Sequence, residues 1–80
     1  MSAHFRFRLS GDLVNARYAK GYTQMYVAEV ANLSPREYQR IEKGTISPGA
    51  EPFLRLVYLL DLDVESYREV VMKDISVHPR

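Results

Sequence analysis

The sequence predicts a mainly α-helical domain of about five short helices, and three observations support this fold class. Apolar residues recur three and four positions apart over much of the chain, which is the spacing of a buried helix face. Residues 23–44, TQMYVAEVANLSPREYQRIEKG, predict two short amphipathic helices joined by a tight polar turn. Within them, Ser34-Pro35-Arg36-Glu37 forms a strong helix start.

Length and composition indicate one small intracellular domain. The 80 residues predict a single domain over 1–80, with its core at about 12–67. Apolar residues make up 46% of the chain, and the lack of cysteine excludes disulfides. The first ten residues lack the apolar run of a signal peptide, and no stretch approaches the ~18 apolar residues of a membrane span. We therefore expect a soluble, cytoplasmic protein with no membrane association.

The N-terminal segment predicts a short strand followed by a helix. Apolar residues alternate with Arg6 and Arg8 over residues 5–9, which is the period of a half-buried strand. Gly11-Asp12 then ends the strand and starts a helix that stops near Gly21. The alternative for this terminus is a flexible arm that places Arg6 and Arg8 in a DNA minor groove.

The next two helices have clear start and stop signals. Thr23 is the predicted N-cap of the second helix, and Asn32 is a plausible left-handed stop. Ser34 is the predicted N-cap of the third helix, and Glu37 completes its capping box. We expect this helix to end at Lys43-Gly44, because a basic residue suits its negative end and glycine suits the stop.

Two further helices and a second strand complete the prediction. The most apolar helix begins near Glu51 or Pro52 and continues to Leu60, and Asp63 can cap a fifth helix that continues to Val71. Apolar residues alternate with polar ones over 75–78, which allows a C-terminal strand. We expect segments 5–9 and 74–78 to pair as a small sheet, within one chain or across a dimer, so that the N-terminal strand and the 68–80 tail serve assembly.

The order and spacing of these motifs resemble the lambda-repressor-like, Cro/repressor-type (Xre) helix-turn-helix domains. The resemblance covers about residues 12–67 and implies a five-helix bundle that binds DNA with its third helix, here 35–43, in the major groove. It also implies that Gln24 and Lys43 contact backbone phosphates. The residues that carry it are Arg17, Gly21, Thr23-Gln24, Val27-Ala28, Leu33-Ser34, Ile41-Glu42-Lys43-Gly44, Ser47-Pro48, Leu60 and Leu62.

The third helix has one inward face and one basic outward face. Tyr38, Ile41 and Glu42 fall on the inward face by their spacing, opposite the charged residues. Arg36 and Arg40 lie one turn apart, so both could bind guanine O6 and N7. The alternative is a solvated basic face with no ligand. The predicted DNA-binding residues are Thr23, Gln24, Tyr26, Arg36, Glu37, Gln39, Arg40 and Lys43.

Two carboxylates in this region need separate interpretation. Glu42 faces inward and requires a partner, because an unpaired buried carboxylate is costly. Arg17 is the candidate, and the resemblance implies that this pair is a structural salt bridge. Glu37 could repel phosphate or accept a hydrogen bond from cytosine N4, but we favour a capping role with its side chain toward Ser34.

Charge and exposed aromatic residues leave two function classes open. Residues 1–44 carry a net charge of +3 and residues 45–80 a net charge of −2, which suits one anion-binding face. Together with Met25, three tyrosines occupy expected surface positions and suggest an interface or phosphate contacts. They are Tyr18, Tyr26 and Tyr58.

We therefore expect a sequence-specific transcriptional regulator that binds operator DNA as a homodimer, such as a phage-type repressor, a controller or an antitoxin. The alternative is a protein-interaction module that keeps the fold but binds DNA weakly, and a partner protein such as a toxin fits either class. We expect no cofactor, no metal and no enzymatic activity, because the two histidines lie near opposite ends and no phosphate-binding loop is present.

Overall fold

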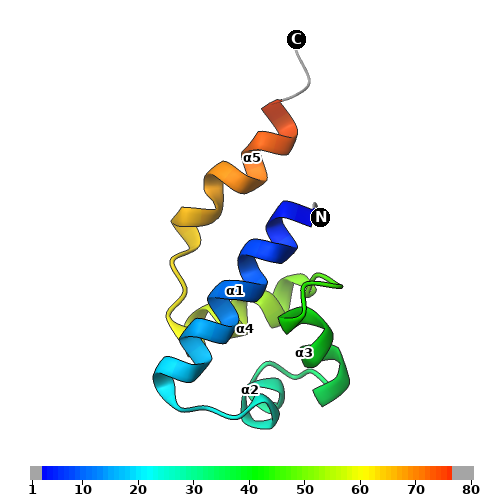
Figure 1. Cartoon of the computed structure of the whole chain (residues 1–80), viewed down its shortest axis with the longest axis vertical. Coiled ribbons are helices and arrows are strands. Elements are labelled where there is room, and N and C mark those ends of the chain that lie inside the picture. Colours follow the sequence, from blue (N-terminus) through cyan, green and yellow to red (C-terminus); the bar gives the residue numbers. More distant parts are fainter. Residues whose placement is uncertain (1–2, 77–80) are drawn as a thin grey trace.

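A computed structural model describes residues 3–76 of the chain, and it is a bundle of α-helices with one 3₁₀ segment (Figure 1). The elements run in the order α1 (Ala3–Lys20), α2 (Gln24–Val30), α3 (Pro35–Glu42), α4 (Ala50–Leu60), η1 (Val64–Tyr67) and α5 (Arg68–Ser76). No strand occurs among the described residues. The predicted mainly helical class is confirmed.

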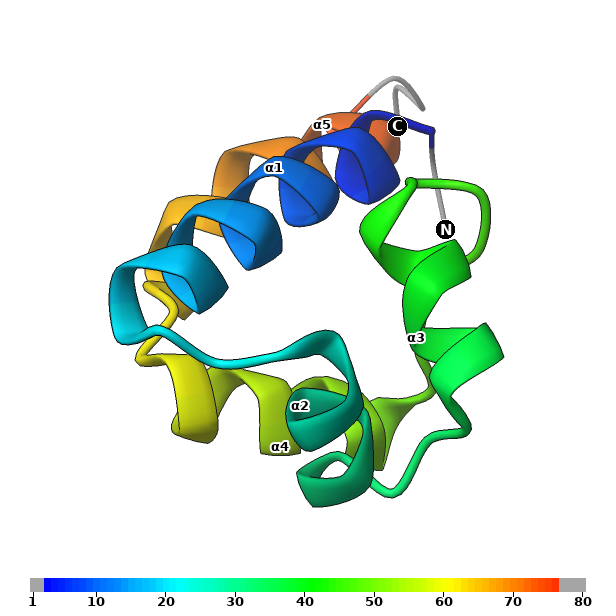
Figure 2. The same ribbon diagram turned by 60° about the horizontal axis from the view of Figure 1, so that its bottom comes forward.

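The helices enclose one apolar core. Each of α1, α2, α3 and α4 contributes fully buried side chains to it, including Leu13, Val27, Ile41 and Leu56. Figure 2 shows α2 lying over α4, and α3 closing the side between α2 and the N-terminal half of α1. Helix α5 follows η1 and runs antiparallel to α1 (Figures 1 and 2). The core therefore supports α3 through α1 and α2.

The predicted strand at residues 5–9 is wrong, because this segment forms the first turns of α1. Phe5, Leu9 and Leu13 are buried and lie four residues apart, which is helical spacing, whereas Phe7 is 65% exposed. Phe5 packs against the rings of Phe53 and Tyr67, with centroids 5.8 and 5.7 Å away. The alternative of a flexible arm is also wrong for this segment, and the predicted helix start at Gly11-Asp12 lies eight residues too late.

The C-terminal expectations are corrected in part. Residues 75 and 76 belong to α5, so the predicted strand is wrong there, while residues 77–80 lie outside the described part. The predicted pairing of 5–9 with 74–78 is therefore absent over the described residues. Asp63 holds the N-cap position of η1, but its side chain makes no capping bond; instead its carbonyl accepts from the Ser66 backbone N–H and hydroxyl.

The predicted helix boundaries around α2 and α3 are confirmed. The Thr23 side chain accepts a hydrogen bond from the Tyr26 backbone N–H, at 3.0 Å. Asn32 has φ of +61° and occupies the left-handed region predicted for it. Gly21 and Gly44 also have positive φ, at +71° and +80°, where glycine is favoured. Asn32 thus shapes the turn between α2 and α3, while Gly21 and Gly44 follow the ends of α1 and α3.

Candidate nucleic-acid interface

Helix α3 begins with the capping box that the sequence predicts. The Ser34 hydroxyl accepts from the Glu37 backbone N–H, and the Glu37 carboxylate accepts from the Ser34 backbone N–H, both at 3.1 Å. Pro35 follows at the first helical position, where no N–H is needed. The capping role that we favoured for Glu37 is therefore confirmed.

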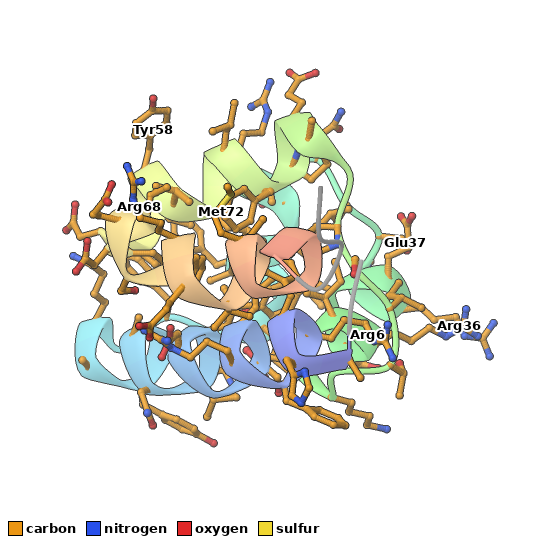
Figure 3. All side chains as sticks on the ribbon, turned by 90° about the horizontal axis from the view of Figure 1, so that it is seen from above. Arg6, Arg36, Glu37, Tyr58, Arg68 and Met72 are labelled. Atoms are coloured by element: carbon orange, nitrogen blue, oxygen red, sulfur yellow. The ribbon has the colours of Figure 1, made fainter. Side chains whose placement is uncertain are left out.

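The outward face of α3 presents cations to solvent. Arg36, Gln39, Arg40 and Lys43 are exposed, and Figure 3 shows Arg36 and Glu37 projecting outward from the bundle. The side chains of Arg36, Arg40 and Lys43 have no hydrogen-bond or ion-pair partner within residues 3–76. Like-charged arginines one turn apart with nothing opposite them leave donors available for an anionic ligand.

The inward face of α3 is held by a buried cluster centred on Glu42. Arg17 donates from Nε to Glu42 Oε2 at 2.6 Å and from Nη2 to Oε1 at 3.1 Å. The Tyr38 hydroxyl donates to Oε2 at 2.5 Å, and Gln24 Nε2 donates to Oε1 at 2.8 Å. We call these four residues the Glu42 cluster. It joins α1, α2 and α3, and the predicted pair of Arg17 with Glu42 is confirmed.

Titration in the Glu42 cluster follows from these contacts. Burial alone would raise the pKa of the Glu42 carboxyl, but hydrogen bonds from Arg17, Tyr38 and Gln24 outweigh it and hold that pKa below its ordinary value. The pKa of the Tyr38 hydroxyl is raised, chiefly by burial and then by its bond to the carboxylate. Glu42 is therefore a carboxylate and Tyr38 a neutral donor at neutral pH.

The three predicted residues at the start of α2 have different surroundings. The Thr23 hydroxyl oxygen is used in capping, and the Gln24 amide N–H is used in the Glu42 cluster. Tyr26 is 43% exposed, and its ring packs on Tyr22 with centroids 4.8 Å apart. A Gln24 contact to phosphate would therefore compete with, or share, its bond to Glu42. The sequence pattern did not reveal that bond.

The structure also shows contacts to α3 that the sequence did not predict. The Ser10 hydroxyl donates to the Glu42 carbonyl, and Arg6 Nε donates to the Gly44 carbonyl at 3.1 Å. The sequence predicts a strand over residues 5–9, and this prediction does not place Arg6 or Ser10 near α3. Their four-residue spacing becomes informative only once residues 3–11 are helical.

The structure gives no sign of a metal site or a membrane span in its described part. No group of three potential ligands among His, Asp and Glu occurs over residues 3–76. Within the same range, no helix is both long enough and apolar enough to cross a bilayer.

A helical bundle with a capped α2–turn–α3 unit and a free basic face on α3 defines a helix-turn-helix DNA-binding domain. The family model described as helix-turn-helix matches residues 13–66, and the chain belongs to this family, of the Cro/repressor type. No curated protein and no solved structure matches the chain. The chain is thus a DNA-binding regulator of the helix-turn-helix kind.

Proposed function

We propose that this protein is a sequence-specific transcriptional regulator that binds operator DNA with α3 in the major groove. The observation that supports this best is the contrast between the two faces of α3. Its inward face is fixed through Tyr38 and Glu42, while Arg36 and Arg40 are exposed, one turn apart and without partners among the described residues. Rigid presentation of two guanidinium groups suits bidentate contacts to guanine.

The remaining predicted residues have different roles in this proposal. Lys43 follows the last turn of α3 and suits a phosphate contact, which positions the protein without reading sequence. Tyr26 offers an exposed side chain beside Gln24 for the same purpose. Gln39 lies between the two arginines on the exposed part of α3, where it can reach a base edge.

The experiment that tests this proposal is selection from a random duplex library, followed by binding of the selected duplex over a salt series. We expect the logarithm of the binding constant K to fall linearly with log[salt]. Arg40→Ala should relax the base preference. Lys43→Ala should weaken binding to all duplexes alike and reduce the slope of log K against log[salt] by ~1. Absence of binding above background at ~50 mM salt would refute the proposal, because the phosphate contribution is strongest there.

The same experiment separates the regulator from a protein-interaction module. Such a module would show no salt-dependent binding, and the exposed Tyr18, Met25 and Tyr58 are the residues that would favour it. We propose a cytoplasmic regulator without catalytic activity.

We further propose that the regulator acts as a homodimer whose two subunits contact each other through a groove beside α5. This α5 groove has a volume of about 410 Å³ and lies between the start of α1, α4, η1 and α5. Phe5, Phe53 and Tyr67 form its floor, and the half-exposed Val71 and Met72 stand beside it. Figure 3 shows Met72 and Arg68 on α5, well separated from Arg36 on α3.

A second copy of this chain fits the α5 groove better than a partner protein with a strong net charge of either sign. Glu65 and Arg68 stand exposed at its rim and pair with each other at 2.5 Å, so the rim has no net charge that would select a partner of one sign. The same surface offers both an apolar hollow and apolar side chains to fill it. Two-fold symmetry would also place two copies of α3 about one DNA turn apart, roughly 34 Å.

Sedimentation tests this interface. We expect a concentration-dependent dimer that Met72→Glu dissociates, while Met25→Glu, at an equally apolar position on α2 that is 69% exposed, leaves it intact. A strictly monomeric chain at micromolar concentration would contradict the dimer, and equal effects of the two substitutions would contradict the location of its interface.

A further inference from the structure

The first turns of α1 contact the C-terminal end of the recognition helix. Residues 3–12 precede the segment 13–66 that matches the helix-turn-helix family. From these turns, the Ser10 hydroxyl donates to the carbonyl of Glu42, the last residue of α3. Arg6 Nε donates to the Gly44 carbonyl, two residues further on, at 3.1 Å. The end of α3 is therefore held by residues that the family match does not include.

These contacts lie on the same side of α1 as the Glu42 cluster. Arg6, Ser10 and Arg17 are separated by four and seven residues, which brings all three to one side of a helix. Arg17 holds the carboxylate of Glu42, and Ser10 holds the carbonyl of the same residue. The two attachment points on α1 are about 10 Å apart along its axis.

Packing at Gly44 strengthens this attachment. A Cβ at Gly44 would lie 3.2 Å from the Phe7 ring and 3.6 Å from the Ser10 Cβ, so the chain passes close against α1 here. The Arg6 guanidinium also brings positive charge to the negative end of α3, which is favourable. Three side chains of the N-terminal turns thus contact residues 42–44.

We propose that Arg6 and Ser10 are positioning residues for sequence reading by α3, and this inference rests on the proposed function. Arg17 holds the side chain of Glu42, the last residue of α3, and a small rotation of α3 about this bond would change where Arg36 and Arg40 meet the base edges. Ser10 and Arg6 hold the backbone at this same end of α3 to a second point on α1, and so limit this rotation. Base readout depends on donor placement within fractions of an ångström, whereas contacts to phosphates tolerate small rotations.

The first experiment measures the attachment in the free protein. The variants are Ser10→Ala and Arg6→Met, and the matched control is Arg8→Met, which removes an equal charge from the other side of α1. Arg8 contacts Asp12 and Ser66 instead. We expect amide hydrogen exchange at Gly44 and Thr45 to accelerate about fivefold in both variants and to stay unchanged in the control. Unchanged exchange in both variants would overturn the inference.

The second experiment measures reading of DNA, on the duplex selected by the unaltered chain and on a scrambled duplex. We expect both variants to lower the affinity ratio between these duplexes about fivefold, with the salt slope unchanged, and Arg8→Met to leave the ratio unchanged. A variant that only lowered global stability would not change this ratio at temperatures where the chain is fully folded.

The possible failures are distinguishable. A slope reduced by ~1 in Arg6→Met alone would mean that Arg6 contacts a phosphate, and it would overturn the positioning role. An unchanged ratio in both variants would overturn it as well. If the unaltered chain bound no duplex, the proposed function and the reading role would both fail, while the exchange experiment would still decide whether the attachment exists.

Discussion

Removing one oxygen atom from Tyr38 tests the Glu42 cluster most directly. Tyr38 is fully buried, and its hydroxyl donates to Glu42 Oε2 at 2.5 Å. Tyr38→Phe keeps the ring and its packing but deletes this bond. A hydrogen bond to a charged group contributes about 1.5–3 kcal/mol, so we expect the free energy of unfolding to fall by about 2 kcal/mol. For a domain of this size, the melting temperature would fall by roughly 8–16 °C.

The pH dependence of this loss identifies its cause. Because the folded-state pKa of Glu42 is lowered, its stabilising contribution is present above the ordinary carboxyl pKa and is lost as the pH falls through the folded-state value. Tyr38→Phe removes one of the bonds that lower this pKa, so in the variant the loss of stability in acid is smaller and is complete at a higher pH. The difference between the two proteins should shrink once Glu42 is protonated in both.

Thermal unfolding followed by circular dichroism, from pH 7 to pH 3, measures both effects. Tyr58→Phe is the control, because Tyr58 is 76% exposed and its hydroxyl makes no bond to the described residues. A loss in Tyr38→Phe no larger than that of the control, or a loss independent of pH, would refute the role assigned to the hydroxyl.

Two further substitutions follow from the same geometry. Arg17→Met should cost about 3–5 kcal/mol at neutral pH, because it leaves the Glu42 carboxylate buried without its counter-charge. The double variant with Glu42→Met should recover much of this loss in urea unfolding, and no recovery would contradict the explanation. Gly44→Ala should destabilise more than Gly21→Ala in the same assay. Both positions have positive φ, at a cost of about 1–2 kcal/mol, but only Gly44 would also press a methyl group onto Phe7. Equal losses of stability in the two variants would contradict this, because they would show that the Phe7 ring moves aside at no cost.

Local signals predicted the α2–turn–α3 unit closely. Ser34 with Glu37 specifies a helix start within four residues, and Asn32 adopts the left-handed conformation that the turn requires. The pairing of Arg17 with Glu42 followed from the cost of a buried carboxylate, together with the family resemblance. These features depend on neighbours in sequence or on one strong requirement.

The strand predicted over residues 5–9 is wrong because strand and helix periodicity cannot be told apart over so short a segment. Phe5 and Leu9 fit a helix as well as a strand, and five residues cannot separate the alternatives. The choice is made by contacts from Phe5 to Phe53 and Tyr67, which lie about 50 and 60 residues away in sequence. The hydrogen bond from the Gln24 amide to Glu42 is likewise a tertiary contact, and the pattern of neighbouring residues does not predict it. Contact between the outward face of α3 and DNA stays a prediction.

Gly11 lowers the local stability of α1 just after its N-terminal turns. It lies inside α1, immediately after Ser10, and a Cβ there would meet no atom within 4 Å. Glycine weakens a helix interior by roughly 0.5–1 kcal/mol relative to alanine, so α1 is weakest between its two attachments to α3. Opening of residues 3–10 as a local unit would expose Phe5 and Leu9, while Arg17 kept its hold on Glu42. The precision with which the recognition helix is aimed should decline with temperature before the bundle melts.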